Sequence, residues 1–279
     1  MKTGTSGLVR IYRPAAPASL PQGTEEQRTF GSSPVPSPTE RWLPAPPQRL
    51  SGASDRTNIY PREVQDMIAE RIGSLLIGYA LGNVLTAEIV TRKLTGRPCR
   101  ELGTTGNPGM ANVMAHLGFK PGIITLAGDL GKCALSCLLA DLLFTPAIGR
   151  IAVLYAGVGC TLGHDFPVWQ KFHGGKGVAT SCLAIFLFSP LWGFVSNVFG
   201  MLVTFITQYL CVGGAVLPAS FVIPMFVFYG REAGFLSLFL AAVCFMEHFP
   251  AIRTIPSGEC EKIDVWGKIK AALTKKGTK

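Results

Sequence analysis

Three polar, glycine-rich segments interrupt an otherwise apolar chain and carry most of its residues suited to chemistry. They are residues 103–112 (GTTGNPGMAN), 163–180 (GHDFPVWQKFHGGKGVAT) and 247–259 (EHFPAIRTIPSGE). Glycine lets the backbone approach a ligand closely and direct successive N–H groups at it. Two glycine-rich turns that open helices, the second with Lys176 inside it, are suited to holding a phosphate. Neither turn has the GxxxxGK[ST] spacing of a Walker A loop.

Ionisable residues also occur inside the apolar runs. Asp129 and Lys132 are three residues apart in one run, and His164 stands beside Asp165 at the end of another. Charged groups within a membrane span are costly and usually face a site or a cavity, so Asp129, Lys132 and His164 are predicted to line one. The structural alternatives are a mutually satisfied Asp129–Lys132 pair and a helix-capping role for His164 with Asp165.

No metal or other cofactor is expected from the cysteine and histidine spacing. The eight cysteines are scattered, and none forms a CxxC motif. Structural zinc sites require closely spaced Cys or His ligands, which this pattern lacks. Most of the cysteines lie in apolar runs, where cysteine behaves as a small hydrophobic residue.

The elements that must position these residues are membrane helices. Of 279 residues, 48% are hydrophobic and only 15% are charged, against about 25% charged in ordinary soluble domains. Residues 177–230 contain no Asp, Glu, Lys, Arg or His. A helix crosses the hydrocarbon core in about 20 residues. The composition therefore indicates a polytopic membrane protein and excludes a soluble enzyme or a nucleic-acid-binding domain.

Three regions are predicted along the chain. Residues 1–66 are rich in Pro, Ser and Gly without helical or strand periodicity, so a disordered extension is expected. Residues 67–250 are expected to form the membrane domain, and residues 251–279 a basic cytoplasmic tail. Met67 directly precedes the first apolar run, and an alternative start there would leave the extension untranslated.

The predicted fold is an all-α integral membrane protein with seven transmembrane helices. The basic residues of 92–100 and the basic C-terminal tail both favour the cytoplasm, because Lys and Arg concentrate on that side. The segment WQKFHGGKG (169–177) comes two spans after 92–100 and is therefore expected on the same side. An even number of spans must then separate it from the tail, which favours three crossings within 177–230. The expected spans are at about 70–91, 121–144, 147–165, 177–194, 197–213, 215–230 and 232–248.

The three polar segments, in this order, resemble the bacterial acyl-phosphate:glycerol-3-phosphate acyltransferases of the PlsY type. The resemblance covers about residues 70–265, and its most specific parts are GNPGMANV (106–113), GDLGK (128–132) and GHDFPVWQKFHGGKGVAT (163–180). It implies a compact seven-helix membrane fold in the plasma membrane, with the active site near the cytoplasmic face. The implied reaction moves a fatty acyl group from acyl phosphate to the sn-1 hydroxyl of glycerol 3-phosphate, giving lysophosphatidic acid for phospholipid synthesis.

The resemblance also implies roles for individual residues. Binding of the acceptor is assigned to Gly106, Asn107, Pro108, Gly109 and Asn112. Binding of the acyl phosphate is assigned to Gly174, Gly175, Lys176 and Gly177. Thr105 and His248 are expected to position or polarise the reacting groups, and Lys176 is expected to be essential for turnover. The partners are the two substrates and the lipid bilayer, with no nucleic acid, and the chain is expected to act as a monomer.

The chemistry agrees with what the sequence contains. Acyl phosphate is a mixed anhydride and is already activated, so proximity and charge stabilisation suffice without a protein nucleophile. The His-x4-Asp dyad of the other large glycerolipid acyltransferase group is absent, since none of the four histidines has Asp five residues later.

The sequence departs from the family where two arginines are expected. Ala115, with His116 beside it, and Gln208 occupy those positions, and Ala251 replaces an asparagine that follows His248. Arginine binds phosphate through two hydrogen bonds, so either Lys120, Lys171 or His116 compensates or the acceptor differs. An acyltransferase with another small acceptor, a catalytically silent paralogue and a transporter therefore remain as alternatives.

Overall fold

The computed structural model describes residues 62–103, 106–260 and 262–263. The extension expected at 1–66 and the tail expected at 251–279 lie largely outside these residues. Helix α1 already begins at Arg62, within the range expected for the extension.

All the regular secondary structure in the described residues is helical. Its elements are α1 (Arg62–Gly82), α2 (Thr86–Thr95), η1 (Cys99–Glu101), α3 (Met110–Leu117), α4 (Phe119–Ile148), α5 (Ile151–Asp165), η2 (Val168–Gln170), α6 (Val178–Phe188), α7 (Pro190–Thr207), α8 (Leu210–Phe228) and α9 (Gly230–Ile252). Turns between the long helices use residues that end or restart a helix. Gly149 and Gly230 adopt positive φ angles of 68° and 86°, which glycine tolerates. Pro190 occupies the first turn of α7, where its missing N–H costs nothing.

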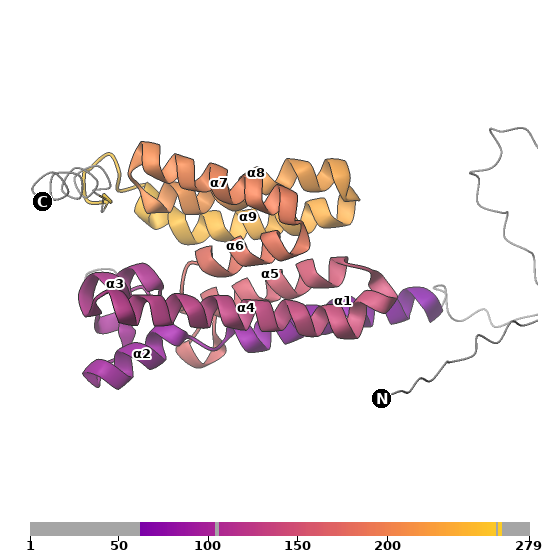
Figure 1. The fold of residues 1–279 in the computed structure, drawn as a ribbon, viewed down its shortest axis with the longest axis horizontal. Coiled ribbons are helices and arrows are strands. Elements are labelled where there is room, and N and C mark those ends of the chain that lie inside the picture. The colour runs from indigo at the N-terminus through magenta and orange to yellow at the C-terminus, as the bar shows by residue number, and fades with distance from the viewer. Residues whose placement is uncertain (1–61, 104–105, 261, 264–279) are drawn as a thin grey trace, which may run out of the picture. The chain divides into compact units, whose positions relative to one another are not determined.

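The long helices form two groups joined by a short one. Helices α1, α4 and α5 contact one another, as do α7 with α8 and α8 with α9, and α6 contacts members of both groups (Figure 1). Most of α5 is buried, because it packs against α1, α4, α6 and α9. The short helices α2 and α3 lie together at one end of the bundle (Figure 1).

The helices have the lengths and surfaces of membrane spans. Five stretches are long and apolar enough to cross a bilayer: Met67–Thr95, Phe119–Ile148, Ile151–Gln170, Pro190–Thr207 and Leu210–Ile252. The last stretch contains both α8 and α9, and α6 is a shorter apolar helix. Large apolar side chains are exposed on the outside, among them Leu142 of α4, Ile206 of α7 and Phe235 of α9. The chain is therefore an all-helical membrane protein.

Two expected spans are interrupted. The span expected at 70–91 is broken at residues 83–85, between α1 and α2, and the one expected at 177–194 is broken at Ser189. The block at 177–230 does contain three helices, α6, α7 and α8, with boundaries that differ from the expected ones by several residues. The polar residue Asn83 and the Ser189–Pro190 pair mark these breaks, but single residues of this kind do not change the hydropathy of a whole span.

Closely packed glycines join α1 to α5. Each helix carries a Gly-x-x-x-Gly motif, Gly78–Gly82 in α1 and Gly159–Gly163 in α5. A Cβ atom at Gly159 would overlap the backbone carbonyl of Leu75, and one at Gly78 would overlap that of Ala156. Small residues allow this backbone approach, which gives van der Waals contact where lipid provides no hydrophobic driving force.

We expect Gly159→Ala to destabilise the protein by about 1–3 kcal/mol, because the added methyl group must push α1 away from α5. Gly131→Ala in α4 is the matched control, since a Cβ there meets nothing within 4 Å. The measurement is thermal unfolding in detergent. A melting temperature for Gly159→Ala equal to that of Gly131→Ala would contradict this account of the packing.

Candidate active site

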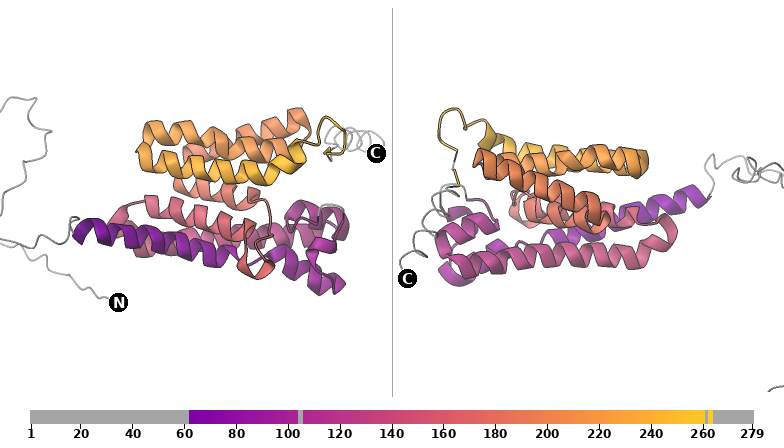
Figure 2. Two further views of the ribbon diagram at one scale, coloured as in Figure 1. Left: turned by 180° about the vertical axis from the view of Figure 1, so that it is seen from behind. Right: turned by 45° about the horizontal axis from the view of Figure 1, so that its top comes forward.

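All three polar segments meet at one end of the helix bundle. The chain direction alternates from helix to helix, so the loop before α3, the connection between α5 and α6, and the C-terminal end of α9 lie at the same end (Figures 1 and 2). Hydrogen bonds also link other chain segments at this end: Val168 N–H donates to Asn83 Oδ1 after α1, and Ile263 N–H donates to Gln208 O after α7, both at 2.9 Å. The shared side expected from the sequence is therefore observed.

The loop at 106–109 is held by the side chain of Asn112. The Nδ2 atom of Asn112, buried in the first turn of α3, donates to the carbonyl oxygens of Leu102 and Asn107, both at 3.0 Å. Gly106 has a φ of 56°, and a Cβ there would lie 2.6 Å from Arg100 O. Pro108 then leads into Gly109, the N-cap of α3. Of the predicted site residues, Thr105 lies outside the described residues.

A buried carboxylate anchors the start of this loop. Glu88, 4% exposed, accepts a hydrogen bond from Cys99 N–H at 2.7 Å and another from Arg92 Nε at 2.5 Å. Cys99 Sγ in turn lies 3.8 Å from Asn107 O. Burial raises the pKa of the Cys99 thiol above its usual value, so the thiol stays neutral. Sequence reasoning missed Glu88, although an acidic residue inside an apolar run was the available signal.

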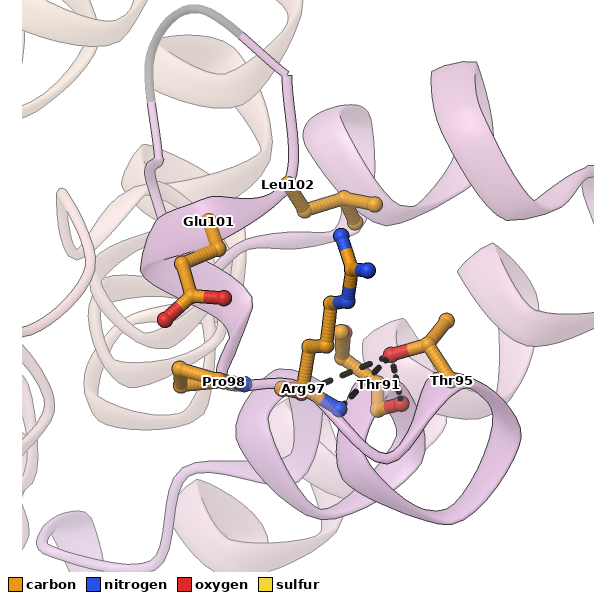
Figure 3. A pocket seen from close by; sticks show the side chains of 6 residues that line it. All are labelled: Thr91, Thr95, Arg97, Pro98, Glu101 and Leu102. Atoms are coloured by element: carbon orange, nitrogen blue, oxygen red, sulfur yellow. Dashed lines mark hydrogen bonds between the residues drawn. The ribbon is translucent and has the colours of Figure 1, made fainter.

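A pocket of about 360 Å³ opens beside this anchor. Figure 3 shows the six residues that line it, with the Arg97 side chain extending past Glu101 toward Leu102. The Thr95 hydroxyl donates to Thr91 O at 2.9 Å and accepts from Arg97 N–H at 3.1 Å. Leu102 connects the pocket to the 106–109 loop. It lines the pocket, and its carbonyl oxygen accepts a hydrogen bond from Asn112, which also holds the loop.

Lys132 joins three helices in the interior. Its Nζ atom donates to Gly82 O at 3.0 Å and Val84 O at 2.7 Å, which are backbone carbonyls at the break between α1 and α2. It also donates to His164 Nδ1 at 2.8 Å and lies 3.2 Å from Asp129 Oδ1. Because Nδ1 accepts this hydrogen bond, a neutral His164 ring carries its proton on Nε2.

The interior cluster of Asp129, Lys132 and His164 is closed. Their exposed fractions are 2%, 7% and 4%, and none of the three lines the pocket beside Thr91. The prediction that they line a site or a cavity therefore stays a prediction. Asp129 and Lys132 form an ion pair, but Asp129 Oδ1 accepts no hydrogen bond among the described residues.

The glycine pair of the second loop packs against His164. Gly175 N–H donates to His164 O and Gly174 N–H donates to Asp165 O, both at 2.9 Å. A Cβ at Gly175 would overlap Nε2 of the His164 ring, and one at Gly174 would overlap His164 O. Both N–H groups therefore bind carbonyls at the end of α5 and are not directed at a ligand, unlike the expectation from the sequence.

Free donors follow directly after the glycine pair. The backbone N–H groups of Lys176 and Gly177 have no hydrogen-bond partner among the described residues, and they precede the N-terminus of α6. The first N–H groups of a helix are likewise unsatisfied and favour an anion. Within the described part of the chain, the Lys176 ammonium forms no ion pair at all. Together these groups form a cationic N-terminal site.

His248 reaches this region from α9. Its ring is 2% exposed, and Nδ1 donates to Cys244 O at 2.6 Å, which leaves Nε2 as the free ring nitrogen. Nε2 faces Gly214 of α8, where a Cβ would lie 2.6 Å away. The same Gly214 Cβ position lies 3.1 Å from Cγ2 of Val178, the first residue of α6, so the ring lies near the N-terminus of that helix. The catalytic roles of Lys176 and His248 stay predictions.

Asp165 is a residue that sequence reasoning treated only as a capping partner. Its side chain is 1% exposed, and both carboxylate oxygens lack a hydrogen-bond partner among the described residues. It faces Gly177, where a Cβ would lie 2.7 Å from Oδ2. A buried unpartnered carboxylate is costly, and its place in an otherwise apolar run was the signal in the sequence.

The chain matches proteins of one family along most of its length. The family model described as glycerol-3-phosphate acyltransferase matches residues 72–258. Glycerol-3-phosphate acyltransferase 1 of Lactobacillus johnsonii is 35% identical over 200 residues, which cover 72% of this chain and 96% of that protein. Glycerol-3-phosphate acyltransferase of Thermoanaerobacter sp. (strain X514) is 31% identical over 196 residues, with 70% and 96% covered.

A solved structure agrees with these sequence matches. The crystal structure of PlsY (YgiH), an integral membrane glycerol 3-phosphate acyltransferase in its glycerol 3-phosphate form, superimposes with a TM-score of 0.62. The identity is 26%, and the match covers 73% of this chain and 98% of that one. With the fold, the shared end of the three polar segments and the Lys176–His248 neighbourhood described, these matches show that the chain belongs to the glycerol-3-phosphate acyltransferase family.

Proposed function

We propose that this protein transfers a fatty acyl group from acyl phosphate to the sn-1 hydroxyl of glycerol 3-phosphate, giving lysophosphatidic acid. The observation that carries the proposal is the site formed by the Lys176 ammonium and the free N–H groups before α6, next to His248. Such a site favours a phosphate group by charge and by hydrogen bonding. Membership of the glycerol-3-phosphate acyltransferase family supports the acceptor.

The reaction needs little covalent chemistry from the protein. The acceptor hydroxyl attacks the carbonyl carbon of the acyl phosphate, a C–O ester bond forms, and the C–O bond to phosphate breaks. The departing phosphate carries the negative charge away and takes up the hydroxyl proton. Lys176 and the adjacent N–H groups hold the phosphate of the donor and stabilise this developing charge. His248 Nε2 orients the acceptor hydroxyl, and proximity supplies much of the rate.

The acceptor is assigned to the neighbouring loop. Gly106, Asn107, Pro108 and Gly109 form it, and Asn112 shapes it through Nδ2 while its Oδ1 remains for the glycerol hydroxyls. Thr105 keeps its proposed role of positioning a reacting group. Asp129, Lys132 and His164 act as positioning residues that join the break after α1 to the end of α5, on which the glycine pair packs.

We place the chain in the plasma membrane as a monomer with seven crossings, formed by α1, α4, α5, α6, α7, α8 and α9. The alternation of these helices supports this count. The end that carries the three polar segments faces the cytoplasm, because Arg92, Lys93, Arg97 and Arg100 lie there.

Lys176→Ala is expected to lower lysophosphatidate formation at least 100-fold, because the phosphate of the donor loses its cation. The assay incubates protein in detergent with palmitoyl phosphate and glycerol 3-phosphate and detects the product by mass spectrometry. Lys93→Ala, an exposed cation of α2, is the control and should keep wild-type activity. Near-full activity of folded Lys176→Ala would reject the proposed phosphate site. Phosphate release only with another acceptor would favour the alternative substrate.

Gly175→Ala is expected to lower kcat at least tenfold, because the methyl group overlaps His164 Nε2 and must displace either the ring or the loop that carries Lys176. Gly131→Ala, with open space at its Cβ, should leave kcat unchanged. Initial rates at several donor concentrations separate kcat from KM. Equal kcat values for the two variants would show that the packing of Gly175 on His164 does not position the loop.

A further inference from the structure

Two cysteines far apart in sequence meet next to the candidate site. Cys211 lies in the first turn of α8, and Cys260 lies in the segment that follows α9. Their Sγ atoms are 3.5 Å apart, and both are free thiols. The start of α8 and the end of α9 lie at the end of the bundle that carries the three polar segments (Figures 1 and 2). The thiol pair therefore lies at the same end of the bundle as the candidate site.

Neighbouring contacts hold the two segments together. Ile263 N–H donates to Gln208 O at 2.9 Å, and the Lys262 ammonium lies 5.4 Å from the ring centre of Tyr209. The second contact is a cation–π interaction. Residues that precede Cys211 and residues that follow Cys260 thus fix the C-terminal segment against the turn between α7 and α8. The two sulfur atoms stay near each other for this reason.

Cys211 is buried, and the remaining cysteines are buried or partly buried. Five of them are buried: Cys99, Cys133, Cys137, Cys160 and Cys244. Cys182 is partly buried in α6. Cys260 is partly exposed and lies beyond the last helix, so a small reagent in water reaches it more readily than it reaches the helix interior.

We propose that Cys211 and Cys260 form a reversible disulfide when the protein meets a small-molecule disulfide such as oxidised glutathione. A covalent S–S bond is about 2.05 Å long, so the two sulfurs must approach each other by roughly 1.5 Å.

The exchange proceeds in two steps. The Cys260 thiolate attacks the reagent disulfide, forms a mixed disulfide and releases one glutathione thiolate. The Cys211 thiolate then attacks the Cys260 sulfur and releases the second. The two protons lost by the protein thiols are taken up by the two departing thiolates. The protein loses two electrons and the reagent gains them.

The bond ties the C-terminal segment to the start of α8, beside Lys176. Disulfides are rare in the cytoplasm, and those that form there are usually transient and redox-sensing. The pair is accordingly a modification site that responds to oxidative conditions and is reversed by thiols.

The test uses the reduced full-length chain in detergent, treated with oxidised glutathione, then alkylated and mapped by mass spectrometry. We expect two of the eight cysteines to escape alkylation and a peptide linking Cys211 to Cys260 that disappears on reduction. Trypsin offers a second readout, because exposed Arg253 precedes Cys260. In the oxidised protein, the fragment at 254–262 should stay attached until a reductant is added.

Three variants test whether these two cysteines form the link. Cys211→Ser should prevent the link and leave glutathione on Cys260, and Cys260→Ser should prevent the link without a stable adduct on Cys211. Cys182→Ser is the control and should form the link as the wild type does. Full alkylation of both Cys211 and Cys260 after treatment, or a link that pairs either with another cysteine, would overturn the proposal. None of these readouts depends on catalysis.

Discussion

The arrangement of the site depends on the contacts made by the ammonium group of Lys132. A charged side chain inside a membrane helix is costly unless polar partners surround it. Here the partners are two backbone carbonyls at the break after α1, the Nδ1 atom of His164, and Asp129. The break at 83–85 supplies carbonyls that a continuous helix would keep for itself. The carbonyl oxygens at the helix break therefore accept hydrogen bonds from the buried ammonium group.

Lys132 can contact both Gly82 and His164 because α1 and α5 pack closely together. Glycines at 78, 82, 159 and 163 let α1 approach α5 so closely that side chains there would overlap backbone atoms. That approach brings the end of α1 next to the end of α5, where His164 and Asp165 lie. The carbonyl oxygens of His164 and Asp165 then receive the N–H groups of Gly175 and Gly174. The position of the Lys176 loop thus follows from helix packing.

The sequence predicted the large features because each has a strong local signal. An uncharged block from Gly177 to Gly230 indicated membrane helices, and the parity of basic segments brought the three polar segments to one end. The helix breaks at 83–85 and Ser189 were missed, since Asn83 and the Ser189–Pro190 pair are too short to lower the hydropathy of a whole span.

The sequence did not predict which groups form hydrogen bonds with one another within the site. Glycine spacing indicates that backbone N–H groups are available for close contacts, but not which acceptor they find. Gly174 and Gly175 are predicted to bind phosphate, and in the structure their N–H groups donate to carbonyls of α5. Asn112 was expected to bind the acceptor, and its Nδ2 shapes the loop. Only the packing of α5 against the loop decides these partners, and it depends on residues far apart in the chain.

The most direct test of this account is hydrogen–deuterium exchange of folded Lys132→Met beside the wild type. If Lys132 joins the helix break to the glycine loop, exchange will accelerate in residues 82–86 and in residues 173–177 together, although these segments are distant in sequence. The turn between α7 and α8 at 207–210 should keep its wild-type rate. Faster exchange confined to α4, or unchanged exchange in both segments, would contradict the central role of Lys132.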